Sequence, residues 1–174
     1  MIAALPHKNC IILRLEVGEV STEHSDLLRL EVLETAARQL HIPILNFKND
    51  WIDSILLNDL LEKLKSFSEV DKTCLLISGK YLEEQVTVCA LEALAQGFDV
   101  YLLMDMIVPR NQNAKQAIEA RLYLAGAVPT SLGQFIYLWF SAETVVADKL
   151  ILQELFSQYN RVLNHASAAR TGLS

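Results

Sequence analysis

The stretch from Thr73 to Asp105 constrains the fold more than any other part of the chain. It holds a short apolar run that ends at Gly79, a polar connection, an amphipathic segment, and a second apolar run that ends at Asp105. The two apolar runs are typical of buried strands. The segment between them repeats apolar residues at three- and four-residue spacing and is followed by Gly97, which is typical of a helix and its end. A strand, a helix and a strand in this order predict a βαβ unit with parallel strands.

The rest of the chain continues this alternation of strand and helix patterns. Further apolar runs predict strands at residues 10–15, 42–45 and 127–130. Helical patterns follow or separate them at residues 25–40, 54–65, 113–125, 132–140 and 142–165. This order predicts an α/β fold, a three-layer doubly wound parallel sheet of about five strands in the order 2-1-3-4-5, with a long C-terminal helix. We expect a single domain over residues 1–174.

Composition narrows the class of partner. The 174 residues are 52% hydrophobic, which is high for a small monomer, and no apolar run approaches the length needed to cross a bilayer. The net charge of −6 without a basic cluster argues against nucleic acid. No basic leader precedes a long apolar region at the N-terminus, so no signal peptide is expected. We therefore expect a cytoplasmic homo-oligomer, a dimer or larger, with no nucleic-acid or membrane partner.

The predicted helix at 142–165 leaves two alternatives open. Its apolar stripe is longer than one small sheet needs for cover. The helix either packs on its own domain or forms an oligomerisation arm that is exchanged with a neighbouring subunit.

Motifs for cofactors and metals are missing from the sequence. No GxGxxG or GxxxxGK[ST] motif follows a strand, so a nucleotide fingerprint is absent. The three cysteines lack CxxC spacing, and none of the four histidines lies four residues from another. We expect no cofactor and no metal site.

One pattern between Gly79 and Thr130 resembles a known family, the isochorismatase-like cysteine hydrolases. This family includes nicotinamidases, N-carbamoyl amidohydrolases and isochorismatases. The pattern joins a strand-closing glycine, a six-residue step to a helix, the small residues of that helix, an aspartate after the next strand, and a Gly-Ala before a threonine. In this chain these positions are Gly79, Gln85, Ala93, Gly97, Asp105, Gly126, Ala127 and Thr130. The resemblance spans about residues 10–138 and implies the same α/β fold.

The reaction of this family requires three residues, and the resemblance implies where each would lie. A cysteine at the start of the central helix attacks as thiolate, an aspartate at the end of the first strand takes its proton, and a lysine assists. In this chain the cysteine position is Gln85, whose amide is not a comparable nucleophile. The aspartate position is Leu15, or Glu16 if the strand carries a one-residue bulge, and the lysine position is Lys48.

These positions indicate a protein with the fold of this family but without its catalytic cysteine and aspartate. We expect a protein that has lost Cys-Asp-Lys hydrolysis and acts as a non-catalytic homo-oligomeric or small-ligand-binding module. The carboxyl ends of the strands are where such a fold binds ligands. The expected crevice for a small polar ligand is formed by Gly79, Lys80, Tyr81, Gln85 and Asp105.

Two alternatives from other classes remain. The protein could be an active hydrolase of C–N or vinyl-ether bonds with a rebuilt site of Glu16, Lys48 and Cys89. Cys89 lies four residues after Gln85, one turn deeper along the helix, where burial would raise the pKa of a thiol. A partner chain could also complete the site.

Overall fold

The computed structural model describes residues 6–16, 24–48, 54–68 and 73–171. Two compact units can be distinguished. The sheet unit comprises Asn9–Val20 and Pro43–Thr130, and the helical unit comprises Met1–Lys8, Ser21–Ile42 and Ser131–Ser174.

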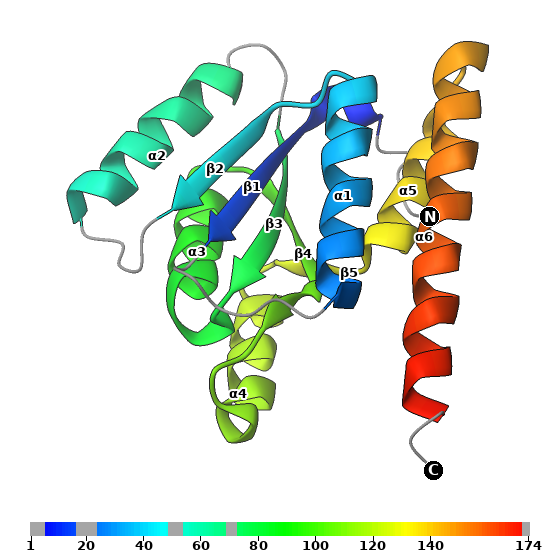
Figure 1. The fold of residues 1–174 in the computed structure, drawn as a ribbon. Coiled ribbons are helices and arrows are strands. Elements are labelled where there is room, and N and C mark those ends of the chain that lie inside the picture. Colours follow the sequence, from blue (N-terminus) through cyan, green and yellow to red (C-terminus); the bar gives the residue numbers. More distant parts are fainter. Residues whose placement is uncertain (1–5, 17–23, 49–53, 69–72, 172–174) are drawn as a thin grey trace. The chain divides into compact units, whose positions relative to one another are not determined.

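The sheet unit contains five parallel strands in the order β2-β1-β3-β4-β5 (Figure 1). The strands are β1 (Cys10–Glu16), β2 (Ile44–Lys48), β3 (Cys74–Lys80), β4 (Asp99–Val108) and β5 (Val128–Thr130). The helices of this unit are α2 (Ser54–Ser68), α3 (Thr87–Ala95) and α4 (Gln112–Leu124), and a π-helical turn, η2 (Leu82–Val86), precedes α3. The predicted α/β fold and its strand order 2-1-3-4-5 are confirmed.

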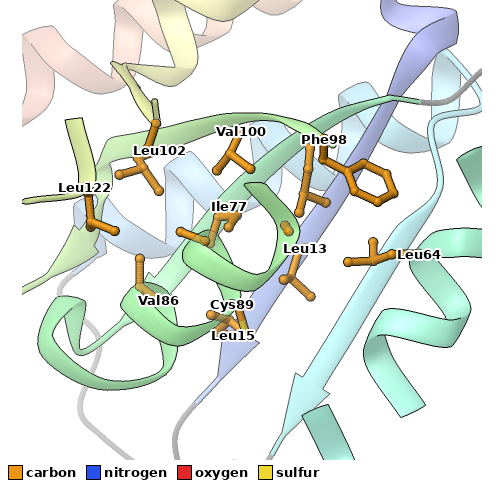
Figure 2. Close-up of a cluster of buried hydrophobic side chains, with 14 of the residues drawn as sticks. Leu13, Leu15, Leu64, Ile77, Val86, Cys89, Phe98, Val100, Leu102 and Leu122 are labelled. Atoms are coloured by element: carbon orange, nitrogen blue, oxygen red, sulfur yellow. The ribbon is translucent and has the colours of Figure 1, made fainter. Parts of the chain in front are cut away.

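An apolar cluster joins this sheet to α2, α3 and α4 (Figure 2). Alternate residues of the central strands point into it, among them Leu13 of β1, Ile77 of β3 and Leu102 of β4, all fully buried. Leu64 of α2 and Cys89 of α3 contribute from the helices. Each large aliphatic side chain buried in this way stabilises the fold by about 1.5–3 kcal/mol.

The helical unit contains α1 (His24–Gln39), α5 (Leu132–Ala142) and α6 (Val146–Thr171), and a short 3₁₀ turn, η1 (His7–Asn9), begins in it. Both α1 and α5 pack against α6 (Figure 1). Ser131 caps α5 as its position before the apolar run predicts, because its Oγ accepts a hydrogen bond from Gln134 N at 3.1 Å. Gly133 lies where Tyr159 of α6 approaches so closely that a Cβ would be 2.6 Å from the ring carbon Cδ1.

The long C-terminal helix differs from its predicted range of 142–165, since α6 begins and ends later. Ser141, the residue before the predicted start, lies inside α5, where its Oγ donates to Tyr137 O at 2.9 Å. The Oε1 atom of Glu143 accepts from the next two backbone N–H groups, at 2.8 and 2.7 Å. These bonds hold the turn between α5 and α6, which is why one predicted helix start was wrong by four residues.

Among the helices in the described part of the chain, none combines the length and the apolar content that a membrane span requires.

Candidate functional site

The second strand brings a predicted site residue into the sheet. It was expected to end at Leu45 but continues through Lys48, which is the register partner of Glu16 in β1. On the other side of β1, Leu15 pairs with Gly79. Pairing continues beyond the apolar run because polar residues mark the end of burial and not the end of the ladder. Glu16, Lys48 and Gly79 thus meet at one carboxyl edge, although the side chain of Glu16 lies outside the described residues.

The fourth strand is irregular at the same edge. It was expected to end at Asp105 but continues to Val108. Ile77 pairs with Leu102, whereas Gly79, two residues on, pairs with Ile107, five residues on. Extra residues of this kind bend a strand and redirect its side chains. Asp105 lies within this irregular stretch and is half-buried.

Gly79 is required by the packing of two strands. Its φ is +145°, and a Cβ there would clash with the Leu15 carbonyl and lie 2.7 Å from Leu15 Cβ. Real Cβ atoms do not approach a neighbour so closely, so β1 and β3 could not keep this spacing with another residue. The glycine therefore has a structural reason that is independent of any ligand.

Tyr81 holds an uncommon backbone conformation directly after β3. Its φ and ψ are 64° and 78°, in the left-handed region, and its N donates to Val108 O at 2.8 Å. The π-helical turn η2 follows at once, so the predicted polar connection over residues 80–84 is already helical from Leu82. A left-handed residue that is not glycine costs about 1–3 kcal/mol, and π-helical turns are frequent at functional sites.

A set of polar contacts fastens the loop after β4 to this turn. The Glu83 carboxylate accepts from the backbone N–H groups of Arg110 at 2.8 Å and Asn111 at 2.7 Å. The Arg110 guanidinium lies 4.1 Å from the Tyr81 ring centroid and pairs with Glu84 at 3.0 Å. Burial raises the pKa of Glu83, but the two backbone donors outweigh it and the net pKa is lowered. No sequence pattern indicates these contacts, because their partners are 27 and 28 residues apart.

Two of the three positions that the family resemblance selects are buried, Gln85 and Leu15. Gln85 lies in η2 and is 3% exposed, and Leu15 is 1% exposed within the apolar cluster. Cys89, the displaced candidate, belongs to the same cluster (Figure 2). Burial raises the pKa of the Cys89 thiol to about 12, so the reactive thiolate is scarce at neutral pH.

The other two cysteines lie at the opposite end of the sheet. Cys10 and Cys74 each begin a strand and are register partners, fully buried and free of disulfides. A hydrogen bond between the two thiols and burial both raise the pKa of Cys74. Neither thiol is placed near the carboxyl edge.

One cluster of a histidine and two carboxylates lies outside every site that the sequence predicts. His7, Glu143 and Asp148 of the helical unit offer ligand-type atoms that lie within 4.8 Å of one another, which makes them the one such group among the described residues. No sequence spacing could indicate it, because more than one hundred residues separate the histidine from the carboxylates.

Comparisons with known proteins identify the fold. No protein-family model and no curated protein matches the sequence. YcaC from Escherichia coli, described as an octameric hydrolase of unknown specificity, is 17% identical, with a TM-score of 0.69 over 100% of this chain and 99% of that chain. YcaC from Pseudomonas aeruginosa, solved with hexane-2,5-diol and covalent acrylamide, is 17% identical, with a TM-score of 0.65 over 96% and 98%.

MAR1 ribonuclease from Caenorhabditis elegans is 15% identical, with a TM-score of 0.70 over 88% of this chain and 92% of that chain. These three structures share the fold of this chain. At such low identity the similarity establishes the isochorismatase-like fold, and it does not transfer an activity.

Proposed function

We propose that this protein is a homo-oligomer with the isochorismatase-like fold that lacks cysteine-dependent hydrolysis and binds a small polar ligand at the carboxyl edge of its sheet. The observation that carries the proposal is the buried glutamine at the nucleophile position, Gln85. Two further features support it. Leu15, at the proton-acceptor position, is a core residue, and the nearest thiol, Cys89, is buried with a raised pKa.

A retained binding crevice explains why the carboxyl edge keeps its irregular geometry. Strained residues persist only where the surrounding structure holds them, and they cluster at ligand sites. Here the left-handed Tyr81 and the π-helical turn are both held by the loop that carries Arg110. A purely structural module would gain stability by relaxing this region. The proposed crevice comprises Gly79, Lys80, Tyr81, Gln85 and Asp105, the residues predicted from the sequence.

The composition and the helical unit support self-association. Leu152, Leu155 and Tyr159 of α6 are buried, so one face of this helix is covered within its own chain. Val146 and Leu150 remain largely exposed on the same helix. We propose that this second face forms part of a subunit interface, and the octameric state of the E. coli neighbour is in line with it. Light scattering after gel filtration should show an oligomer, whereas a stable monomer would contradict this part.

Turnover and binding assays with one compound panel test the proposal. Amides, carbamoyl compounds and vinyl ethers are incubated with the protein, and product is compared with a buffer blank and with Cys89→Ser protein. We expect no turnover in either protein. In the same panel, a ligand that raises the unfolding temperature should lose its effect in Tyr81→Ala but keep it in Tyr123→Ala, an exposed tyrosine on α4. Turnover that one crevice substitution abolishes would overturn the proposal.

A second candidate function is an active hydrolase with a rebuilt site. The register pairing of Glu16 with Lys48 at the carboxyl edge favours it, because a carboxylate and an amine on neighbouring strands can divide acid and base roles. The burial of Cys89, the third member of this site, weighs against it. Turnover that Lys48→Ala abolishes and Lys63→Ala preserves would establish this candidate, since Lys63 is an exposed lysine of α2.

The single domain over residues 1–174, the cytoplasmic location and the absence of nucleic-acid partners belong to the same proposal.

A further inference from the structure

A buried histidine lies between two carboxylates in the helical unit. The Nδ1 atom of His7 is 2.9 Å from Glu143 Oε2, and its Nε2 atom is 3.7 Å from Asp148 Oδ2. The side chains of His7 and Glu143 are 3% and 5% exposed, and that of Asp148 is 27% exposed. The ring thus faces a carboxylate at each of its nitrogens, at the junction between α5 and α6.

Only the charged form of the ring suits this environment. A neutral imidazole has one N–H donor and one nitrogen lone pair, whereas an imidazolium donates from both nitrogens. With a neutral ring, one carboxylate would therefore face a lone pair. A buried carboxylate that loses its counter-charge destabilises a protein strongly.

The Glu143 carboxylate is well suited to remain ionised. The backbone N–H of Val145 lowers the pKa of Glu143 most, burial opposes this, and the N–H of Thr144 and the charges of His7 and Lys8 lower it further. Lys8 is thus another cation near this carboxylate.

A metal ion explains the cluster less well. A bound cation would need both carboxylates on the side of one ring nitrogen, yet here they face different nitrogens. Lys149, the residue after Asp148, is another cation of α6, and its Nζ lies 5.1 Å from the Phe140 ring centroid.

We propose that His7 is a charged latch. Its imidazolium holds residues 6–8 against the α5–α6 junction, and loss of its proton releases these residues. The contribution of the latch to stability has two limits in pH. A histidine cation that folding favours stabilises at low pH, and this contribution is lost as pH rises through the titration of the folded ring. The lowered pKa of Glu143 acts in the opposite sense, since its contribution is present above the ordinary carboxyl range and is lost as pH falls. The contacts of His7 with the two carboxylates are therefore intact at pH values between these two limits.

Unfolding temperatures of the full chain between pH 4 and pH 9 test the latch. The wild-type temperature should fall from pH 6 to pH 9, and His7→Gln should remove most of this fall. Glu143→Gln keeps an oxygen for the two backbone N–H groups but removes the charge that faces His7. It should lower the unfolding temperature at pH 6 by about 4–8 °C. The matched control Glu154→Gln, on the exposed surface of α6, should lower it by less than about 2 °C.

A direct readout does not depend on variants that fold. The ¹⁵N shifts of the wild-type His7 ring at pH 6 should show two protonated nitrogens. A neutral ring at pH 6, or identical pH profiles for wild type and His7→Gln, would overturn the latch. Stabilisation by added Zn²⁺ that His7→Gln abolishes would also overturn it, in favour of a metal site.

Discussion

The two ends of the parallel sheet differ in the regularity of their strand pairing. At the amino end, Cys10–Leu13 pairs with Cys74–Ile77 without interruption, and the side chains are apolar and buried. At the carboxyl end the register of β3 and β4 shifts, Gly79 and Tyr81 have positive φ, and a π-helical turn follows. The carboxyl end is where such sheets bind ligands. The irregular geometry therefore lies at the end of the sheet where we propose that a small ligand binds.

The regular end should be the more sensitive to loss of side-chain volume. Leu13→Ala removes a fully buried side chain from the centre of the apolar cluster and should reduce the free energy of unfolding by about 3–4 kcal/mol. Urea denaturation measures this loss. Leu27→Ala, at an exposed position of α1, is the matched control and should change it by less than about 0.5 kcal/mol. A small effect at Leu13 would mean that the cluster is not the centre of stability.

The irregular end should be sensitive to backbone geometry instead. Gly79→Ala adds a Cβ against Leu15 at a positive φ, so we expect a loss of about 2–3 kcal/mol in urea denaturation. Gly97→Ala is the matched control, because its φ is also positive but a Cβ there meets nothing within 4 Å. It should lose only about 1 kcal/mol. Equal losses would show that close strand packing at Gly79 is unimportant.

The contacts around Arg110 should matter for local order more than for global stability. Arg110→Ala removes the guanidinium from Tyr81 and Glu84 but keeps the backbone N–H that donates to Glu83. Because the arginine is largely exposed, the global loss should stay at or below about 1 kcal/mol. Hydrogen exchange of the η2 amides should become about 3- to 10-fold faster. Arg121→Ala, on the exposed side of α4, should leave this exchange unchanged.

The smallest expected effect is a change in how the unfolding temperature depends on pH. The pKa of Glu83 is lowered in the folded protein, so its contribution is present above the ordinary carboxyl range and is lost as pH falls through the folded value. Glu83→Gln should therefore make the decrease in unfolding temperature between pH 6 and pH 3 slightly shallower. Glu62→Gln, at an exposed ion pair of α2, should leave the decrease unchanged. A steeper decrease in Glu83→Gln would show that the two backbone donors do not favour the carboxylate.

The sequence was sufficient for the fold and its strand order, because buried strands and amphipathic helices carry periodic patterns. It also predicted that Gly79 and Gln85 lie at the carboxyl edge. Strand ends were less predictable, since β2 extends to Lys48 through pairing with β1 and β4 continues past Asp105 through a register shift. Such features depend on contacts between strands and leave no local pattern.

Contacts between distant segments could not be predicted from the sequence for the same reason. The pairing of Glu83 with the loop after β4 needs the β3–β4 neighbourhood to exist first. The cluster around His7 likewise joins the two ends of the chain, where no spacing rule applies. The left-handed conformation of Tyr81 was also hidden, because a tyrosine gives no sequence signal for positive φ.

Thiol labelling of the native protein tests whether the site holds a nucleophilic cysteine. The protein is incubated with iodoacetamide at pH 8 and its intact mass is measured, with a second sample in urea as the control. All three cysteines are buried, and burial raises the pKa of Cys89 to about 12. We expect an unmodified native mass and three adducts after unfolding. One rapid adduct in the native state that maps to Cys89 would contradict the claim that this site has no nucleophilic thiol.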